Sequence, residues 1–183
     1  MIKVRVHGRG GEGAVTFAQI LCASVRFDGK FGLSCMSPAA ERRGAPVEAF
    51  ARIGDKRIAE RGNIAKPDIV TVLNPALTRI VNVEAGMNEG SKLIINARND
   101  PGLSHATVYL DATSIALRIL GVPITNTVML GAFAAATGLV TLESLEKGTR
   151  LLLGSRFSEE KLQRNIEAIK AGYEEVKVGQ GIH

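Results

Sequence analysis

The sequence predicts an α/β fold, with a doubly wound and mainly parallel sheet, an inserted antiparallel hairpin, and a single domain over residues 1–183. Three observations lead to this prediction. Strand-like segments alternate with helical ones, short loops join them, and no internal repeat or linker interrupts the pattern. Apolar residues make up 45% of the 183 residues, which is enough for a sizeable core and excludes a disordered chain.

The elements up to residue 66 follow from two kinds of periodicity. Apolar and polar residues alternate from Ile2 to His7, which is typical of a strand with one covered face. The pair Gly54-Asp55 has the composition of a two-residue hairpin turn. The expected elements are a strand over Ile2–His7, a helix over Ala14–Phe27, a strand over Phe31–Met36, a loop over Ser37–Pro46, and hairpin strands over Val47–Ile53 and Lys56–Ala59.

After Pro67 the alternation becomes regular, and capping residues mark the helix starts. Asp111, Asn126 and Thr141 are each placed to cap a helix, and Ser158 precedes two glutamates that suit the positive first turn of the longest helix. The expected elements are strands over Asp68–Leu73, Leu93–Asn96 and Thr107–Leu110, a short helix over Ala76–Ala85, a helix from Asp111 to Leu120, and helices that begin at Asn126, Thr141 and Ser158.

The first strand conflicts with a sheet that is covered on both faces. Strands of such sheets read as continuous apolar runs, yet here Lys3, Arg5 and His7 share one side. Either the strand lies near an edge of the sheet, or its polar side meets something charged. In a subunit of an assembly, the charged element could be another chain.

The composition limits what the chain can bind. Trp is absent and Tyr plus Phe total eight, which disfavours a nucleic-acid module built on aromatic stacking. Two cysteines cannot by themselves ligate an iron–sulfur cluster, and they could form a zinc site only with help from the three histidines. They also give no disulfide framework, so we expect no metal site and a reducing cytoplasm. The uncharged stretch 119–142 is long enough for a membrane span, but its Pro, Asn and Thr residues predict a buried helix instead.

The net charge of +5 is unevenly placed. Up to Lys66 the chain has twelve Lys and Arg against six Asp and Glu, and the remainder is close to balance. A positive first third could attract phosphates, nucleic acid or an acidic partner, whereas the simplest interpretation is solvated surface charge.

The clearest local motif is GRGGEG at residues 8–13, which has the G-x-G-x-x-G pattern between a predicted strand and helix, as in Rossmann-like sheets. Glycines allow close backbone approach, and the free amides of a helix N-terminus attract an anion. Gly8, Gly10, Gly11 and Gly13 are therefore candidate phosphate contacts. Dinucleotide binding would also need a carboxylate at the end of the second strand, where the sequence has none. A tight turn without a ligand is the alternative.

A second motif is ERRGAPV at residues 41–47. Adjacent arginines beside a glycine turn could grip a phosphate or carboxylate, or form salt bridges at a surface or an interface. The cysteines and histidines are scattered along the chain, and we identify no catalytic residues.

Together the two motifs resemble the gamma subunit of 2-oxoacid:ferredoxin oxidoreductases, most of all the pyruvate:ferredoxin oxidoreductase (pyruvate synthase) form. The resemblance covers nearly the whole chain. Its stretches are HGRGGEGAVT at 7–16, DGK at 28–30, ERRGAPV at 41–47, VYLDAT at 108–113 and NTVMLGA at 126–132.

The resemblance implies a chain that is one part of a larger enzyme. Such complexes oxidatively decarboxylate a 2-oxoacid (here pyruvate or a branched-chain 2-oxoacid) on thiamine diphosphate, pass electrons through iron–sulfur clusters to ferredoxin, and transfer the acyl group to coenzyme A. By this resemblance the chain is mainly structural, binds none of these cofactors alone, is inactive in isolation, and has alpha, beta and delta-type subunits as partners.

The resemblance also implies roles for charged residues of the first third, either at subunit interfaces or in contact with an anion. One departure from the family pattern is Glu12, where Gln is more usual. The candidate interface or anion contacts are Lys3, Arg5, Arg9, Glu41, Arg42 and Arg43.

Two other functions stay open from the sequence. The glycine motif suggests a stand-alone NAD(P)-binding oxidoreductase, although the acidic residue that would hold the ribose is missing. The basic first third suggests nucleic-acid binding, but the chain lacks aromatic residues and a recognisable reading motif. We expect no nucleic-acid or membrane partner.

Overall fold

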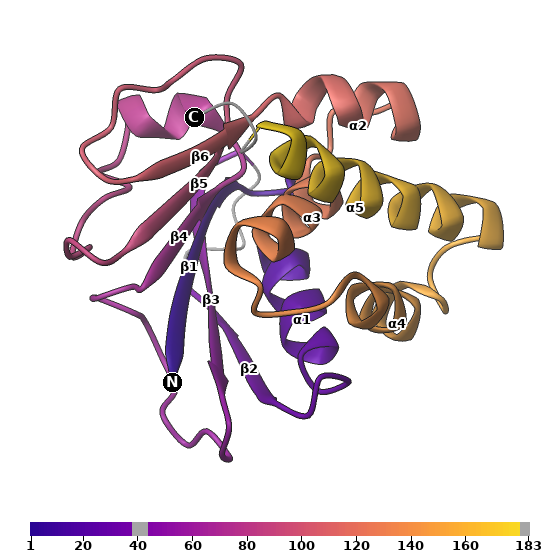
Figure 1. The fold of residues 1–183 in the computed structure, drawn as a ribbon, viewed down its shortest axis with the longest axis horizontal. Coiled ribbons are helices and arrows are strands. Elements are labelled where there is room, and N and C mark those ends of the chain that lie inside the picture. The colour runs from indigo at the N-terminus through magenta and orange to yellow at the C-terminus, as the bar shows by residue number, and fades with distance from the viewer. Residues whose placement is uncertain (38–43, 180–183) are drawn as a thin grey trace.

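The computed structural model describes residues 1–37 and 44–179, which form a six-stranded mixed sheet packed against helices (Figure 1). The elements in chain order are β1 (Ile2–Arg9), α1 (Ala14–Ser24), β2 (Phe31–Met36), β3 (Pro46–Gly54), β4 (Ile69–Val72), the 3₁₀ helix η2 (Pro75–Arg79), β5 (Lys92–Asn96), β6 (Thr107–Leu110), α2 (Ala112–Leu120), α3 (Asn126–Thr137), α4 (Leu142–Leu153) and α5 (Glu159–Gly179).

The strand order is β2-β3-β1-β4-β5-β6. The pairs β1–β4, β4–β5 and β5–β6 are parallel, whereas β3 is antiparallel to both of its neighbours, β1 and β2. The predicted α/β class with a mainly parallel sheet and an antiparallel portion is confirmed. The predicted hairpin is wrong, because β3 has β1 on one side and β2 on the other. Segment Lys56–Ala59 therefore finds no free edge of β3 and forms no strand.

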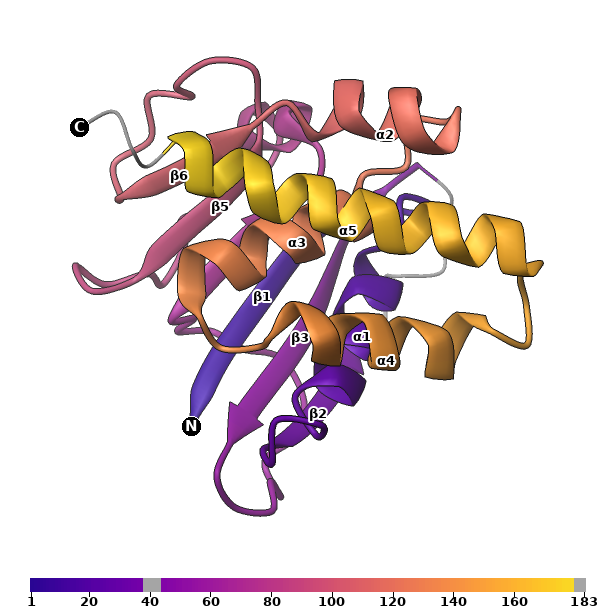
Figure 2. The same cartoon turned by 45° about the vertical axis from the view of Figure 1, so that its right-hand side comes forward.

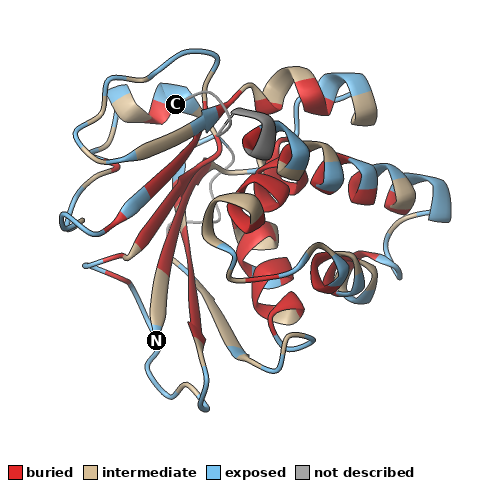
Figure 3. Ribbon diagram, viewed as in Figure 1, coloured by how far each residue is buried: buried red, intermediate tan, exposed pale blue. Residues whose placement is uncertain are grey.

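The two faces of the sheet are covered differently (Figures 1 and 2). The five α-helices of the described residues lie on one face, where α1, α3 and α5 contact the strands and α2 and α4 pack mainly against these helices. The large apolar core on this face includes an edge-to-face contact of Phe17 with Phe133 at 5.9 Å. The opposite face carries a smaller apolar cluster around Val70 and Leu77, covered by η2 and by loops. Buried residues follow the central strands and the helix sides turned toward them (Figure 3). On this second face, a 3₁₀ helix and loops thus take the place that α-helices have in a doubly wound sheet.

β1 is a central strand, so the polar side of its sequence does not mark an edge. Val4 and Val6 are fully buried toward the helices. Arg5 and His7 point to the other face and are also buried, at 5% and 3% exposure. Other segments of the same chain cover this side, and the backbone carbonyls of Val83 and Ala85 accept hydrogen bonds from Arg5.

Helix boundaries test the capping predictions. Asp111 caps α2 by accepting from the Ser114 amide at 2.9 Å, and Thr141 caps α4. For α3 the cap position is Thr125, one residue earlier than predicted, and Asn126 is the first helical residue. α1 ends at Ser24 rather than Phe27, because the following residues form tight turns that lead back into β2.

The helix predicted over Ala76–Ala85 is shorter than expected and of a different type. The Asn74 side chain accepts from the Ala76 amide at 3.0 Å and starts η2, which ends at Arg79. Val83 leaves the helical path to enter the smaller apolar cluster, where its side chain is 2% exposed. The chain beyond η2 therefore forms turns that bury Val83.

The apolar stretch after residue 119 contains α3, which is buried between the sheet and α5. Gly131 and Gly172 let α3 and α5 approach closely, since a Cβ on Gly172 would lie 2.8 Å from the Val128 carbonyl carbon. The buried-helix interpretation is confirmed. Among the described residues, no helix combines the length and the apolar character that a membrane crossing requires.

Candidate functional site

The glycine motif forms the connection from β1 to α1, as the sequence predicted. Gly11 and Gly13 have φ values of 97° and 87°, a region that side-chain-bearing residues rarely adopt. At Gly13 space is also restricted, because an added Cβ would lie 2.9 Å from the Cγ atom of Asn126. The third and fourth glycines of the motif are thus required by backbone geometry and by the close approach of α3.

The loop is held in place by its own carboxylate. Glu12 accepts a hydrogen bond from the Arg9 amide at 2.8 Å through Oε2 and one from Asn74 Nδ2 at 2.6 Å through Oε1. Asn74 follows the end of β4 by two residues, so Glu12 connects the glycine loop to the end of the neighbouring strand. Glu12 is therefore a structural anchor, with both carboxylate oxygens occupied inside the chain.

The glycine loop also pairs with the end of the second motif. The Gly10 amide donates to the Ala45 carbonyl at 2.9 Å, and the Gly44 amide donates to the Gly10 carbonyl at 3.1 Å. These bonds bring residues 44–45 next to residue 10. The predicted contacts Glu41, Arg42 and Arg43 lie outside the described residues.

A cleft of about 610 Å³ opens at the N-terminal end of α1. No side chain of the described residues caps this helix end, and its first turn contains no acidic residue, so its free amides favour an anion. The start of α5 forms the opposite wall. The lining residues are Gly11, Gly13, Thr16, Leu120, Val122, Ile124, Asn126, Leu153, Arg156, Phe157, Ser158, Glu160, Lys161, Arg164 and Asn165.

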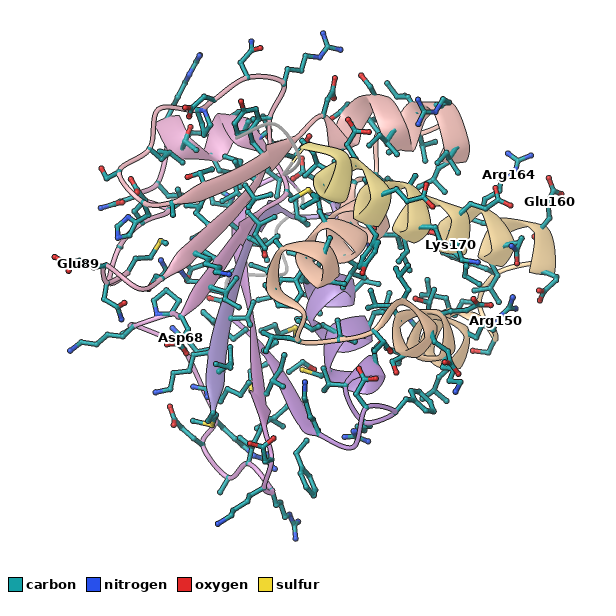
Figure 4. All side chains as sticks on the ribbon, viewed as in Figure 1. Asp68, Glu89, Arg150, Glu160, Arg164 and Lys170 are labelled. Atoms are coloured by element: carbon teal, nitrogen blue, oxygen red, sulfur yellow. The ribbon has the colours of Figure 1, made fainter. Side chains whose placement is uncertain are left out.

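The cleft combines cations with apolar walls. Arg156, Lys161 and Arg164 supply positive charge. Among the described residues, Arg164 pairs with Glu160 at 2.8 Å, and the other two cations form no ion pair (Figure 4). The Lys161 ammonium lies 4.3 Å from the centre of the Phe157 ring. A ligand with phosphates and an apolar arm matches this lining better than a purely polar ligand does.

Sequence reasoning identified the glycines of this cleft but missed its other wall. Arg156, Lys161 and Arg164 come from the region around the start of α5, which was expected only to pack on the body. The spacing of three residues between Lys161 and Arg164 places both on one helix face, so the sequence could have indicated a basic side of this helix. Asn126 was predicted as a cap, and its contact with Gly13 depends on the approach of α3.

The predicted contacts in the first strand behave differently from one another. Lys3 is partly exposed and pairs with Glu60 at 3.4 Å. The Arg9 guanidinium has no partner among the described residues, and its Nε atom is buried. The structure thus leaves Arg9 available for an external contact, beside the glycine loop.

The structure corrects the expectation that Arg5 is an interface or anion contact, because its guanidinium lies inside the fold and not at the surface. Nη2 donates to the Val83 and Ala85 carbonyls at 3.0 and 2.7 Å, and Nε donates to His7 Nε2 at 3.0 Å. Burial lowers the pKa of Arg5, and the nearby Glu48 carboxylate opposes this shift. Arg5 therefore ties the loop after η2 to the centre of the sheet.

Burial holds the His7 ring and the Cys22 thiol in their neutral forms. Burial, reinforced by the Arg5 guanidinium, lowers the pKa of His7 to about 4, so its ring is neutral and accepts the Arg5 hydrogen bond. Burial raises the pKa of the Cys22 thiol to about 12, which removes its nucleophilic form. Within residues 1–37 and 44–179, no three His, Cys, Asp or Glu side chains gather in a way that could hold a metal ion.

The sheet topology also bears on dinucleotide binding. β2 is separated from β1 by β3, and its six residues carry no carboxylate that could hold a ribose. Fold and site together define an α/β protein whose β1–α1 loop and α5 enclose an anion-suited cleft. The chain matches the family model described as "Pyruvate ferredoxin/flavodoxin oxidoreductase" over residues 3–175, and it belongs to that family.

The resemblance seen in the sequence is confirmed by similar proteins of full length. The chain is 45% identical over 177 residues to pyruvate synthase subunit PorC of Methanocaldococcus jannaschii, covering 96% of this chain and 97% of that one. The crystal structure of pyruvate oxidoreductase subunit PORC from Thermotoga maritima is similar with a TM-score of 0.82 and 34% identity, over 95% of this chain and 96% of that one.

A larger protein contains the same fold. The structure of 2-oxoglutarate:ferredoxin oxidoreductase from Magnetococcus marinus, with 2-oxoglutarate, coenzyme A and succinyl-CoA bound, matches 97% of this chain with 31% of its own chain. The TM-score is 0.79 and the identity 18%, so this likeness concerns the fold.

Proposed function

We propose that this chain is the gamma-type subunit of a cytoplasmic, multi-subunit 2-oxoacid:ferredoxin oxidoreductase. The complex would release CO2 from pyruvate or a branched-chain 2-oxoacid, pass the electrons to ferredoxin and transfer the acyl group to coenzyme A. The observation that carries the proposal is the 45% identity, over almost the whole length of both chains, to a pyruvate synthase subunit. Its partners would be alpha, beta and delta-type subunits.

The cofactors of this chemistry would be held by the partner subunits. Two cysteines are fewer than the four thiolates that commonly hold an iron–sulfur cluster. Thiamine diphosphate would supply the carbanion chemistry on a partner subunit. The contribution of this chain would be to position its partners and to complete a binding surface.

We further propose that the cleft between α1 and α5 receives the anionic portion of coenzyme A in the complex. The α1 amides and the cations Arg156 and Lys161 suit its phosphates, and Val122 and Phe157 suit its apolar arm. The Magnetococcus marinus protein, which binds coenzyme A, supports this choice of ligand through its fold alone.

The experiment is anaerobic purification of the chain with its co-purifying proteins, followed by an assay of 2-oxoacid-dependent ferredoxin reduction. We expect activity that requires coenzyme A and that disappears when this chain is omitted from a reconstitution. Full turnover by the isolated chain, or a complex that never needs the chain, would contradict the proposal. Tight binding of NADH by the isolated chain, followed by fluorescence, would favour the NAD(P)-binding alternative.

A further inference from the structure

Within residues 1–37 and 44–179, no strand pairs with the outer edge of β2. β2 stands at one end of the strand order, with β3 on its inner side only. The Ser37 amide donates to the Glu48 carbonyl at 3.0 Å, and in an antiparallel pair every second residue of a strand bonds to its neighbour in this way. The backbone N–H and C=O groups of Leu33 and Cys35 therefore face β3, whereas those of Gly32, Ser34 and Met36 point outward.

This edge lacks the features that usually protect an edge strand from pairing. Its sequence, FGLSCM, has no charged residue and no proline. Phe31 and Met36, at its two ends, are 47% and 55% exposed, and Phe27 just before the strand is 49% exposed. In the view of Figure 1, β2 lies at the outer side of the sheet, beside the turn that follows α1. The edge is thus open and apolar.

A basic groove accompanies the first half of the same edge. It has a volume of about 820 Å³ and lies between the turn after α1 and the loop after β3. Its cations are Arg26, Lys30, Arg57 and Arg61, and the lining residues that the structure describes include no carboxylate. Lys30 donates to the Leu139 carbonyl at 2.7 Å, whereas the three arginines form no ion pair with any described residue. The groove therefore offers unneutralised positive charge next to unpaired backbone groups.

We propose that the β2 edge binds an extended, acidic segment of a partner polypeptide, which adds a strand to the sheet and places its carboxylates in the basic groove. Main-chain hydrogen bonds to Gly32, Ser34 and Met36 would supply the pairing, and the arginines would select for negative charge. The inference rests on the proposed function in taking the partner to be another subunit of the complex. A second copy of this chain fits less well, because its β2 strand, FGLSCM, contains no carboxylate that could occupy the basic groove.

The test is hydrogen exchange of single amides in β2, compared between the isolated chain and the purified complex. In the complex, the outward amides of Gly32, Ser34 and Met36 should exchange at least about tenfold more slowly. The amides of Leu33 and Cys35 are an internal control, because they already face β3 and should change little.

Two variants probe the same edge through assembly with the partner subunits. Ser34→Pro removes an outward N–H without removing a bond to β3, and Arg57→Glu with Arg61→Glu reverses two groove charges in an exposed loop. Each should weaken association by about tenfold, the charge variant most strongly at low salt. Arg79→Glu, an exposed cation on η2, is the matched control and should leave association unchanged.

Each outcome has a defined meaning. A complex that reduces ferredoxin while its outward β2 amides exchange at the rate of the isolated chain overturns this proposal and leaves the proposed function standing. An isolated chain that dimerises with the same amides protected assigns the edge to a second copy and also overturns it. If no complex forms at all, both proposals fail.

Discussion

Replacing Arg5 with methionine tests whether this buried guanidinium is a structural clamp or an interface residue. Met keeps much of the side-chain length but leaves the Val83 carbonyl and the His7 Nε2 atom without a donor in the interior. Each buried orphan group costs roughly 1–3 kcal/mol, and about 1 kcal/mol is returned because a charge no longer has to be buried. The Ala85 carbonyl is only partly buried and can turn to water.

The sum is a loss of about 3 kcal/mol in the free energy of unfolding, or a fall of about 6–12 °C in Tm for a chain of this size. Urea and thermal unfolding of the isolated chain, followed by circular dichroism, measure it. Lys3→Met is the comparison, because Lys3 lies on the same strand face but is partly exposed with one ion pair; it should cost less than about 1 kcal/mol. If Arg5→Met unfolded like the wild type and only its assembly suffered, the clamp would be refuted and an interface role restored.

Three further predictions concern the glycine loop, the cleft and pH. Gly13→Ala should cost roughly 2–4 kcal/mol of unfolding free energy, because both its φ of 87° and the nearby α3 oppose a Cβ. Gly11→Ala should cost about 1 kcal/mol, because no described atom lies close to the added Cβ. Thermal unfolding of the two variants measures the difference. Lys161→Glu should raise the KM for coenzyme A in the complex by about tenfold with little change in kcat, and Arg79→Glu should not. The folded state lowers the pKa of His7 from 6.5 to about 4, so the free energy of unfolding should decrease as pH falls through this interval. The expected decrease is about 2 kcal/mol between pH 7 and pH 5. In urea titrations, His7→Gln should abolish this pH-dependent decrease.

These predictions can fail in distinct ways. Equal destabilisation by the two glycine variants would show that the approach of α3 is not the limiting contact. An unchanged KM in Lys161→Glu would place coenzyme A elsewhere. An identical pH profile in His7→Gln and the wild type would show that the His7 ring is protonated equally in the folded and unfolded chains.

The candidate site was predictable on one side only. The glycine motif predicts a tight turn from strand to helix, because glycine is the residue that readily adopts the positive φ found at Gly11 and Gly13. The opposite wall is formed by Lys161 and its neighbours, about 150 residues further along the chain. Nothing in their local sequence says which surface α5 would meet, so only packing could bring them to the cleft.

The first strand shows the same division. Its alternation correctly predicted a strand with one apolar and one polar side, since a two-residue period is a property of the chain itself. Whether the polar side would face solvent, a partner or the interior depended on what covered it. The loop around Val83 and Ala85 supplies carbonyls there, so Arg5 is buried at the centre of the sheet.

The strand over Val47–Ile53 was also found from its own residues, but its partners were not. A turn signal at Gly54-Asp55 argued for pairing with the next segment, yet β3 pairs with β1 and β2 instead. By itself the sequence determined the α/β class, the helix caps at Asp111 and Thr141, and the family, because these depend on residue type and short spacing. The tertiary structure decided the pairing of β3, the burial of Arg5 and the second wall of the cleft, because each depends on competition among segments that are distant in the chain.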